Sequence, residues 1–173
     1  KYHGTLSIGL LSSKIQLEGP IIRDKTSFNI SARRSYIDLI AKPFMPKDDK
    51  ISYYFYDINA KINHKFSDRS RLFLNFYNGK DSYYFKTTDS SSSMYKDKMS
   101  LNWGNTIATA RWNYIFNQKL FSNTTVAYNK YRMDANSTVY TKTSLLESIS
   151  ESNYHSNYHS GICDWSYLID FDY

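Results

Sequence analysis

Two histidines have a spacing that would suit a metal site. The segment Asn153–Ser160 repeats Asn-Tyr-His-Ser, which places His155 and His159 four positions apart. On a helix, that spacing puts both imidazoles on one face, where they could hold a transition metal. The segment is rich in Ser and Asn and falls within a predicted long loop. We therefore interpret it as a solvated surface rather than a metal site.

Aromatic side chains follow a second predicted loop. The low-complexity run Asp89–Ser93 precedes Tyr95 and Trp103. Rings in a binding loop can stack on a sugar, but rings with polar tips also gather at membrane–water boundaries, and we favour the second interpretation. Together with His155 and His159, these two aromatic residues are the candidate ligand contacts in loops.

Sequence signatures of catalysis are absent. The chain has no Gly-x-Ser-x-Gly, His-Glu-x-x-His or glycine-rich phosphate loop. Cys163 is the only cysteine, so the chain cannot form an internal disulfide. We predict a protein that is not an enzyme and that carries neither a cofactor nor a resident metal.

The composition combines polarity with many aromatic residues. The 173 residues include 17 Tyr and 10 Phe, yet the mean hydropathy is −0.59. Such a chain fits a protein with a wet side, an apolar side and two interfaces. No apolar run is long enough for a transmembrane helix. The net charge is +6, but Lys and Arg are scattered singly along the sequence, so we predict no nucleic-acid binding.

An alternation of period two is the main structural signal. From Tyr53 to Phe66, the even positions are mainly apolar and the odd positions from Asp57 to Lys65 are charged or amidic. A helix cannot separate these two sets, because its apolar positions recur every three or four residues. The alternation recurs in five further segments: Thr26–Ser35, Arg71–Lys80, Thr106–Phe116, Phe121–Arg132 and Ile162–Tyr173.

The first segment, Thr5–Glu18, changes phase, and we interpret the change as a bulge near Leu10 or as a lead-in that joins the barrel late. The sequence therefore predicts about seven strands. Their connections alternate in length: Gly19–Lys25, Ser67–Ser70 and Asn117–Lys119 are short, whereas Lys42–Lys50, Lys86–Ser100 and Asp134–Ser160 are long and polar. The last of these includes a short helical stretch at Ser144–Ser150.

Alternating short and long connections are typical of outer-membrane barrels, with tight periplasmic turns and longer extracellular loops. We predict an all-β fold, an antiparallel up-and-down meander forming part of a larger transmembrane β-barrel. A soluble antiparallel barrel or sandwich would also show alternation. Strands of ten or more residues and charges in mid-strand argue against that alternative.

The first half of the chain resembles the opening barrel strands of TonB-dependent outer-membrane receptors, most closely those of Bacteroidetes. The similarity lies in Leu-Glu-Gly-Pro-Ile at Leu17–Ile21, Ser-Ala-Arg-Arg at Ser31–Arg34 and INHKFSDRSRLFL at Ile62–Leu74. Their order and spacing together carry the resemblance, and the rest of the chain matches in style only.

The resemblance implies an active importer in the bacterial outer membrane, which takes up a glycan, siderophore or cofactor with energy from the TonB complex. It also implies a plug domain inside a barrel of about 22 strands. Neither a plug nor a TonB box is present in this sequence, so we expect residues 1–173 to be part of such a barrel. Related glycan importers also have a surface lipoprotein as partner.

Two other interpretations stay open: a small eight-stranded outer-membrane anchor or adhesion barrel, and a soluble ligand-binding β-barrel. In the importer, the polar face would contact the plug or line the substrate path, although any wet lumen needs polar residues. The residues assigned to this face are Arg33, Asp57, Asn59, Lys61, Arg111, Asn113, Asp164 and Asp170.

Overall fold

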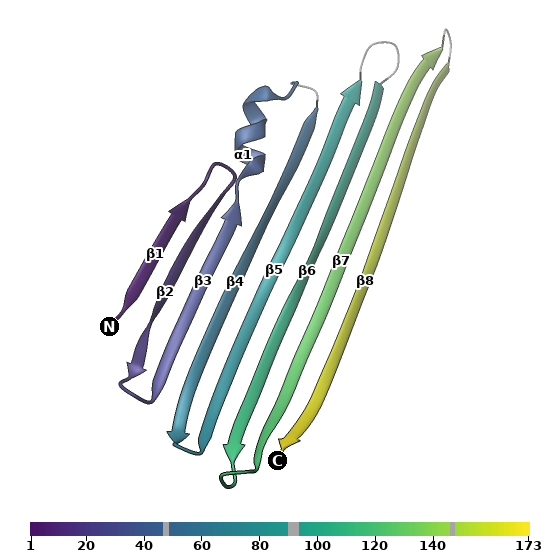
Figure 1. The fold of residues 1–173 in the computed structure, drawn as a ribbon. Helices are drawn as coiled ribbons and strands as arrows, with labels where there is room; N and C mark the ends of the chain where they lie inside the picture. Colours follow the sequence, from purple (N-terminus) through teal and green to yellow (C-terminus); the bar gives the residue numbers. More distant parts are fainter. Residues whose placement is uncertain (47–48, 90–93, 146–147) are drawn as a thin grey trace.

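A computed structural model describes residues 1–46, 49–89, 94–145 and 148–173. These residues form one open antiparallel sheet of eight strands, in the spatial order β1 to β8 (Figure 1). The strands are β1 (His3–Ile8), β2 (Ser12–Ile22), β3 (Thr26–Ser35), β4 (Lys50–Ser67), β5 (Ser70–Asp89), β6 (Met94–Ile115), β7 (Phe121–Leu145) and β8 (Ser148–Asp172). The predicted all-β meander is confirmed.

The eighth strand comes from the segment Thr5–Glu18. The predicted bulge near Leu10 is wrong, because the chain reverses there into a hairpin between β1 and β2, with the amide of Gly9 bonded to the carbonyl of Ser12 at 2.9 Å. Leu6 lies opposite Ile15, so both side chains leave the same face of the sheet. A turn between antiparallel strands therefore produces the phase change.

Tight turns close the lower end of the sheet in Figure 1, as the sequence predicts. Asp24 has a φ of 61°, a left-handed conformation that Asp tolerates in turns. In the β6–β7 turn, the Asn117 side-chain oxygen accepts the amides of Lys119 and Leu120 at 2.8 and 3.0 Å. These bonds satisfy backbone groups that no ladder partner reaches.

The upper connections differ from the prediction. Much of Lys86–Ser100 and Asp134–Ser160 is strand rather than loop, because β5 to β8 continue into both segments. The described part of the predicted helix at Ser144–Ser150 is also strand, and residues 90–93 and 146–147 lie outside the described residues. The strand extensions are paired by polar side chains, for example Lys142 with Glu151 at 2.6 Å.

One upper connection contains helical turns. Between β3 and β4 the chain forms α1 (Ile37–Ala41) and the 3-10 helix η1 (Lys42–Phe44). The Tyr36 hydroxyl donates to the carbonyl of Gly9, and its amide donates to the carbonyl of Leu11 at 3.0 Å. Tyr36 thereby fixes the β1–β2 turn against the start of α1. In the described ranges, no helix is long and apolar enough to span a membrane.

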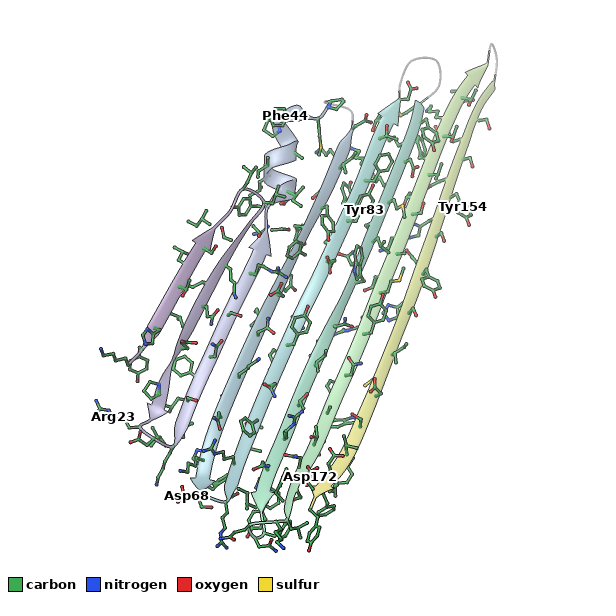
Figure 2. All side chains as sticks on the ribbon, viewed as in Figure 1. Arg23, Phe44, Asp68, Tyr83, Tyr154 and Asp172 are labelled. Atoms are coloured by element: carbon green, nitrogen blue, oxygen red, sulfur yellow. The ribbon has the colours of Figure 1, made fainter. Side chains whose placement is uncertain are left out.

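The sheet is a single layer. Side chains leave both faces in Figure 2, and in the part of the chain that the structure describes no hydrophobic side chain is buried. The buried side chains are small or polar: Thr26, Ser35, Asp57, Ser70 and Ser122. A single-layer sheet has no second element against which to bury its apolar surface.

Candidate functional site

The pairing register divides the side chains into two faces, since directly paired residues point to the same side. Face A carries Ile58, Ala60 and Ile62, and face B carries Asp57, Asn59 and Lys61. In the lower half of the sheet, face A is an apolar band that runs across all the strands. Its members on the longest strands are Ile58, Ala60, Ile62, Leu72, Leu74, Phe76, Ala108, Ala110, Trp112, Val126, Tyr128, Trp165, Tyr167, Ile169 and Phe171.

Aromatic rings gather at the lower margin of this band. The rings of Trp112 and Tyr114 have centroids 5.7 Å apart, Tyr114 and Phe116 are 4.9 Å apart, and Phe116 and Phe171 are 6.4 Å apart. The Trp112 indole donates to the Ser70 hydroxyl at 2.9 Å. The apolar band therefore ends, next to the turns, in a row of aromatic rings in which the Trp112 indole N–H has a hydrogen-bond partner.

Face B at the same level is mainly charged or amidic, although it also carries Phe73, Tyr77, Ile107 and Leu168. All eight residues predicted to share a polar wall lie on it: Arg33, Asp57, Asn59, Lys61, Arg111, Asn113, Asp164 and Asp170. The Asn113 amide donates to Asn123 at 3.0 Å, and the Asn29 amide donates to Glu18 at 2.8 Å. The register thus places all eight on one face, whereas their exposure to a lumen or contact with a plug stays a prediction.

The two faces exchange polarity halfway along the strands. In the upper half, face B carries a cluster that we name the aromatic patch: Tyr53, Phe55, Tyr83, Phe85, Met99, Leu101, Trp103 and Met133. Tyr83 marks its level in Figure 2. Above the apolar band, face A carries instead a cluster that we name the basic surface: Arg34, Lys50, Lys80, Lys86, Lys96, Lys98, Lys130, Arg132 and Lys142.

Polar groups border the aromatic patch. Arg33 forms an ion pair with Asp57, with Nη2 and Oδ2 2.7 Å apart, and its guanidinium lies 5.0 Å from the centroid of the Phe55 ring. The Tyr53 hydroxyl donates to Asp81 at 2.7 Å, and this bond to a carboxylate raises the pKa of Tyr53. The patch thus combines flat apolar rings with oriented hydrogen-bonding groups. This combination suits a ligand that has both an apolar surface and hydrogen-bonding groups.

The four residues predicted to contact ligand from loops all lie in strands. Tyr95 and Trp103 belong to β6 and point to face B, with Trp103 inside the aromatic patch. His155 and His159 belong to β8 and point to face A. The placement in loops is therefore wrong, and the sheet separates the two aromatic residues from the two histidines.

The histidines have protein partners rather than a metal-like arrangement. His155 Nδ1 lies 2.9 Å from the Thr138 hydroxyl, and His159 is hydrogen-bonded to Asp134. A strand spreads residues four apart by roughly 13 Å, beyond the reach of one ion. The described residues contain no group of three or more His, Cys, Asp or Glu that could hold a metal ion.

The aromatic patch is the feature that the period-two alternation did not reveal. Where a strand passes through the exchange of polarity, both faces are aromatic, and the pattern becomes a continuous run, as in Tyr53–Tyr56 and Tyr83–Phe85. Those runs are the sequence signal for it. Searches of protein-family models, curated proteins and solved structures found no match to this chain.

Proposed function

We propose that this chain forms part of the wall of a transmembrane β-barrel in the bacterial outer membrane, in a TonB-dependent importer of a nutrient. The observation that carries the proposal is the apolar band on face A, which lies over a charged and amidic face B. A lipid-facing exterior and a wet interior would require this division of side chains.

The height of the band supports this proposal. On β8, the face-A residues of the band run from Trp165 to Phe171 and are preceded on the same face by Cys163, so a segment of nine residues carries no charge on face A. A tilted strand needs about 9–11 residues to cross a bilayer. The row of aromatic rings by the lower turns fits an interfacial girdle. With the lower end on the periplasmic side, the upper strand extensions would stand outside the membrane.

The strand lengths favour a large barrel over a small anchor barrel of these eight strands. Direct closure would pair β1, which has six residues, with β8, which has 25. Most of the β8 edge would then be unpaired, including residues of the apolar band such as Trp165. Backbone groups in lipid need partners, so we propose that further strands pair with this edge.

The side chains in the lower half and in the upper half of face B both support a role in import. Its lower half offers amide and charged groups to a plug, and its upper half offers the aromatic patch to a ligand arriving from outside. We propose that Trp103 contacts the ligand within the patch and that Arg33 and Lys61 contact the plug. The substrate class could be a glycan, a siderophore or a cofactor.

Lipid contact is tested with a fluorophore on single cysteines of the intact protein, with Cys163→Ser as the background. Ile62→Cys and Ala108→Cys place bimane on face A, and Asn63→Cys and Thr109→Cys are the matched face-B neighbours. In vesicles of brominated phosphatidylcholine, we expect strong quenching for the first pair only. Equal quenching on both faces, or full solubility without detergent, would refute the membrane wall.

Import itself is tested in cells that carry or lack the protein. Accumulation of labelled cobalamin, a ferric siderophore and a maltooligosaccharide is measured with and without an uncoupler of the proton gradient. We expect one substrate to accumulate only when the protein and the gradient are both present. A purely anchoring barrel would leave all three unchanged.

A further inference from the structure

The basic surface contains nine cations, although Lys and Arg are scattered singly in the sequence. Alternation sends every second residue to face A, and the antiparallel register then aligns cations from neighbouring strands, such as Lys50 with Lys86 and Lys86 with Lys98. In the same rows of face A, the described carboxylates are Asp134 and Glu151. Both have protein partners, namely His159 and Lys142.

A hollow lies at the lower margin of the basic surface, centred on Gly104. It is lined by Lys80 of β5 and by Lys130, Arg132 and Asp134 of β7, and the Asp134 carboxylate is hydrogen-bonded to His159. Gly104 lines this hollow without a side chain, and an added Cβ would lie 2.4 Å from the carbonyl oxygen of Gly79. Gly161, which is paired with Arg132, adds no side chain to face A beside it.

A second, apolar hollow lies directly below along β6. It is lined by Ala108, Ala110 and larger side chains of the band, including Leu74, Tyr128 and Trp165. Thr106 separates the two hollows and accepts a hydrogen bond from Asn78 at 2.8 Å. The small alanines between large neighbours form a slot in the apolar band, and Thr106 is the face-A residue of β6 between this slot and the hollow with the three cations.

We propose that these hollows together bind a phosphorylated membrane lipid. Its phosphate lies among Lys80, Lys130 and Arg132, and an acyl chain lies on Ala108 and Ala110. Arg and Lys bind phosphate by charge-assisted hydrogen bonds, and cations next to an apolar band attract anionic headgroups. An apolar slot next to the three cations favours a lipid over a nucleic acid, which has no use for the slot. This inference rests on the proposed membrane location of face A.

The test uses the intact protein in neutral detergent and native mass spectrometry. Dioleoyl phosphatidic acid and dioleoyl phosphatidylcholine are titrated separately, and inorganic phosphate is added as a competitor without acyl chains. We expect retention of the phosphatidic acid only, with little displacement by phosphate. The triple variant Lys80→Gln, Lys130→Gln, Arg132→Gln should weaken that retention by about tenfold or more.

A control variant removes the same charge from face B: Lys14→Gln, Lys65→Gln, Arg71→Gln. It should retain phosphatidic acid as the natural protein does. Equal losses in both variants, or displacement by free phosphate, would overturn the lipid site. Tight binding of an oligothymidylate that depends on the first three cations would overturn it in favour of nucleic acid.

Reconstitution separates this inference from the proposed function. A protein that inserts into nanodiscs of pure phosphatidylcholine but shows no preference for phosphatidic acid would refute the lipid site alone. Failure to insert into any bilayer would refute both proposals.

Discussion

At the scale of single residues, glycines set how closely the central strands approach. Gly104 of β6 lies opposite Lys80 of β5, and Gly79 is the residue before Lys80. An added Cβ on Gly104 would meet backbone atoms, the carbonyl oxygen of Gly79 at 2.4 Å and the Cα of Lys80 at 3.2 Å. Backbone atoms in the middle of a sheet cannot move aside as a flexible side chain can.

Replacement of Gly104 should therefore destabilise the folded protein. We expect Gly104→Ala to cost about 1–3 kcal/mol, because strands β5 and β6 must separate to admit the methyl group. The midpoint of unfolding by guanidinium, followed by tryptophan fluorescence in detergent, measures the change. Gly4→Ala is the control, since its Cβ would meet only the end of the Leu17 side chain at 3.2 Å. Equal midpoints for the two variants would contradict this account.

At the scale of elements, alternation and turn residues predicted the lower half of the sheet well. Each strand there has one apolar face and one polar face, the condition under which a period of two is visible in sequence. In the upper half the apolar side chains lie on the opposite face, so no single phase of alternation runs along a whole strand. Residues such as Ser100, Asn102, Asn136 and Asn157 on face A form a polar ladder, and their composition resembles that of a loop.

The first hairpin differs from the predicted bulge near Leu10 for another physical reason. A phase change in apolar residues marks either a bulge or a reversal of the chain, and the two differ only in long-range pairing. Leu10 and Leu11 in the turn carry no Pro-Gly or Asn-Gly signal. Likewise, the basic surface could not be read from the sequence, because it depends on the register between four or five strands.

The turn between β6 and β7 gives a test at this scale. Asn117 accepts two backbone amides, from Lys119 and Leu120. We expect Asn117→Ala to lower the free energy of unfolding by about 1–2 kcal/mol, because both amides lose their partner in a tight turn. Lys119→Ala removes an exposed side chain from the same turn and should leave the unfolding midpoint unchanged. A neutral Asn117→Ala would show that water replaces these bonds.

At the scale of the whole molecule, the sheet exposes apolar side chains on face A and an unpaired strand edge at β8. Exposed apolar residues occupy the lower half of face A, including Trp165 at 72% and Phe171 at 63% of full exposure. The β8 strand has 25 residues and pairs on one side only. An edge of that length is a template for pairing with other chains.

These features predict how residues 1–173 behave outside a membrane. In aqueous buffer we expect the chain to aggregate and to bind the dye ANS, because neither the apolar band nor the β8 edge is covered. In a mild detergent, the far-ultraviolet circular dichroism should show β-structure, since micelles cover face A while face B stays hydrated. A monomer that stays soluble without detergent and unfolds cooperatively would mean that the eight strands bury a core by another arrangement. The single-layer wall would then be refuted, and the soluble ligand-binding barrel would take its place.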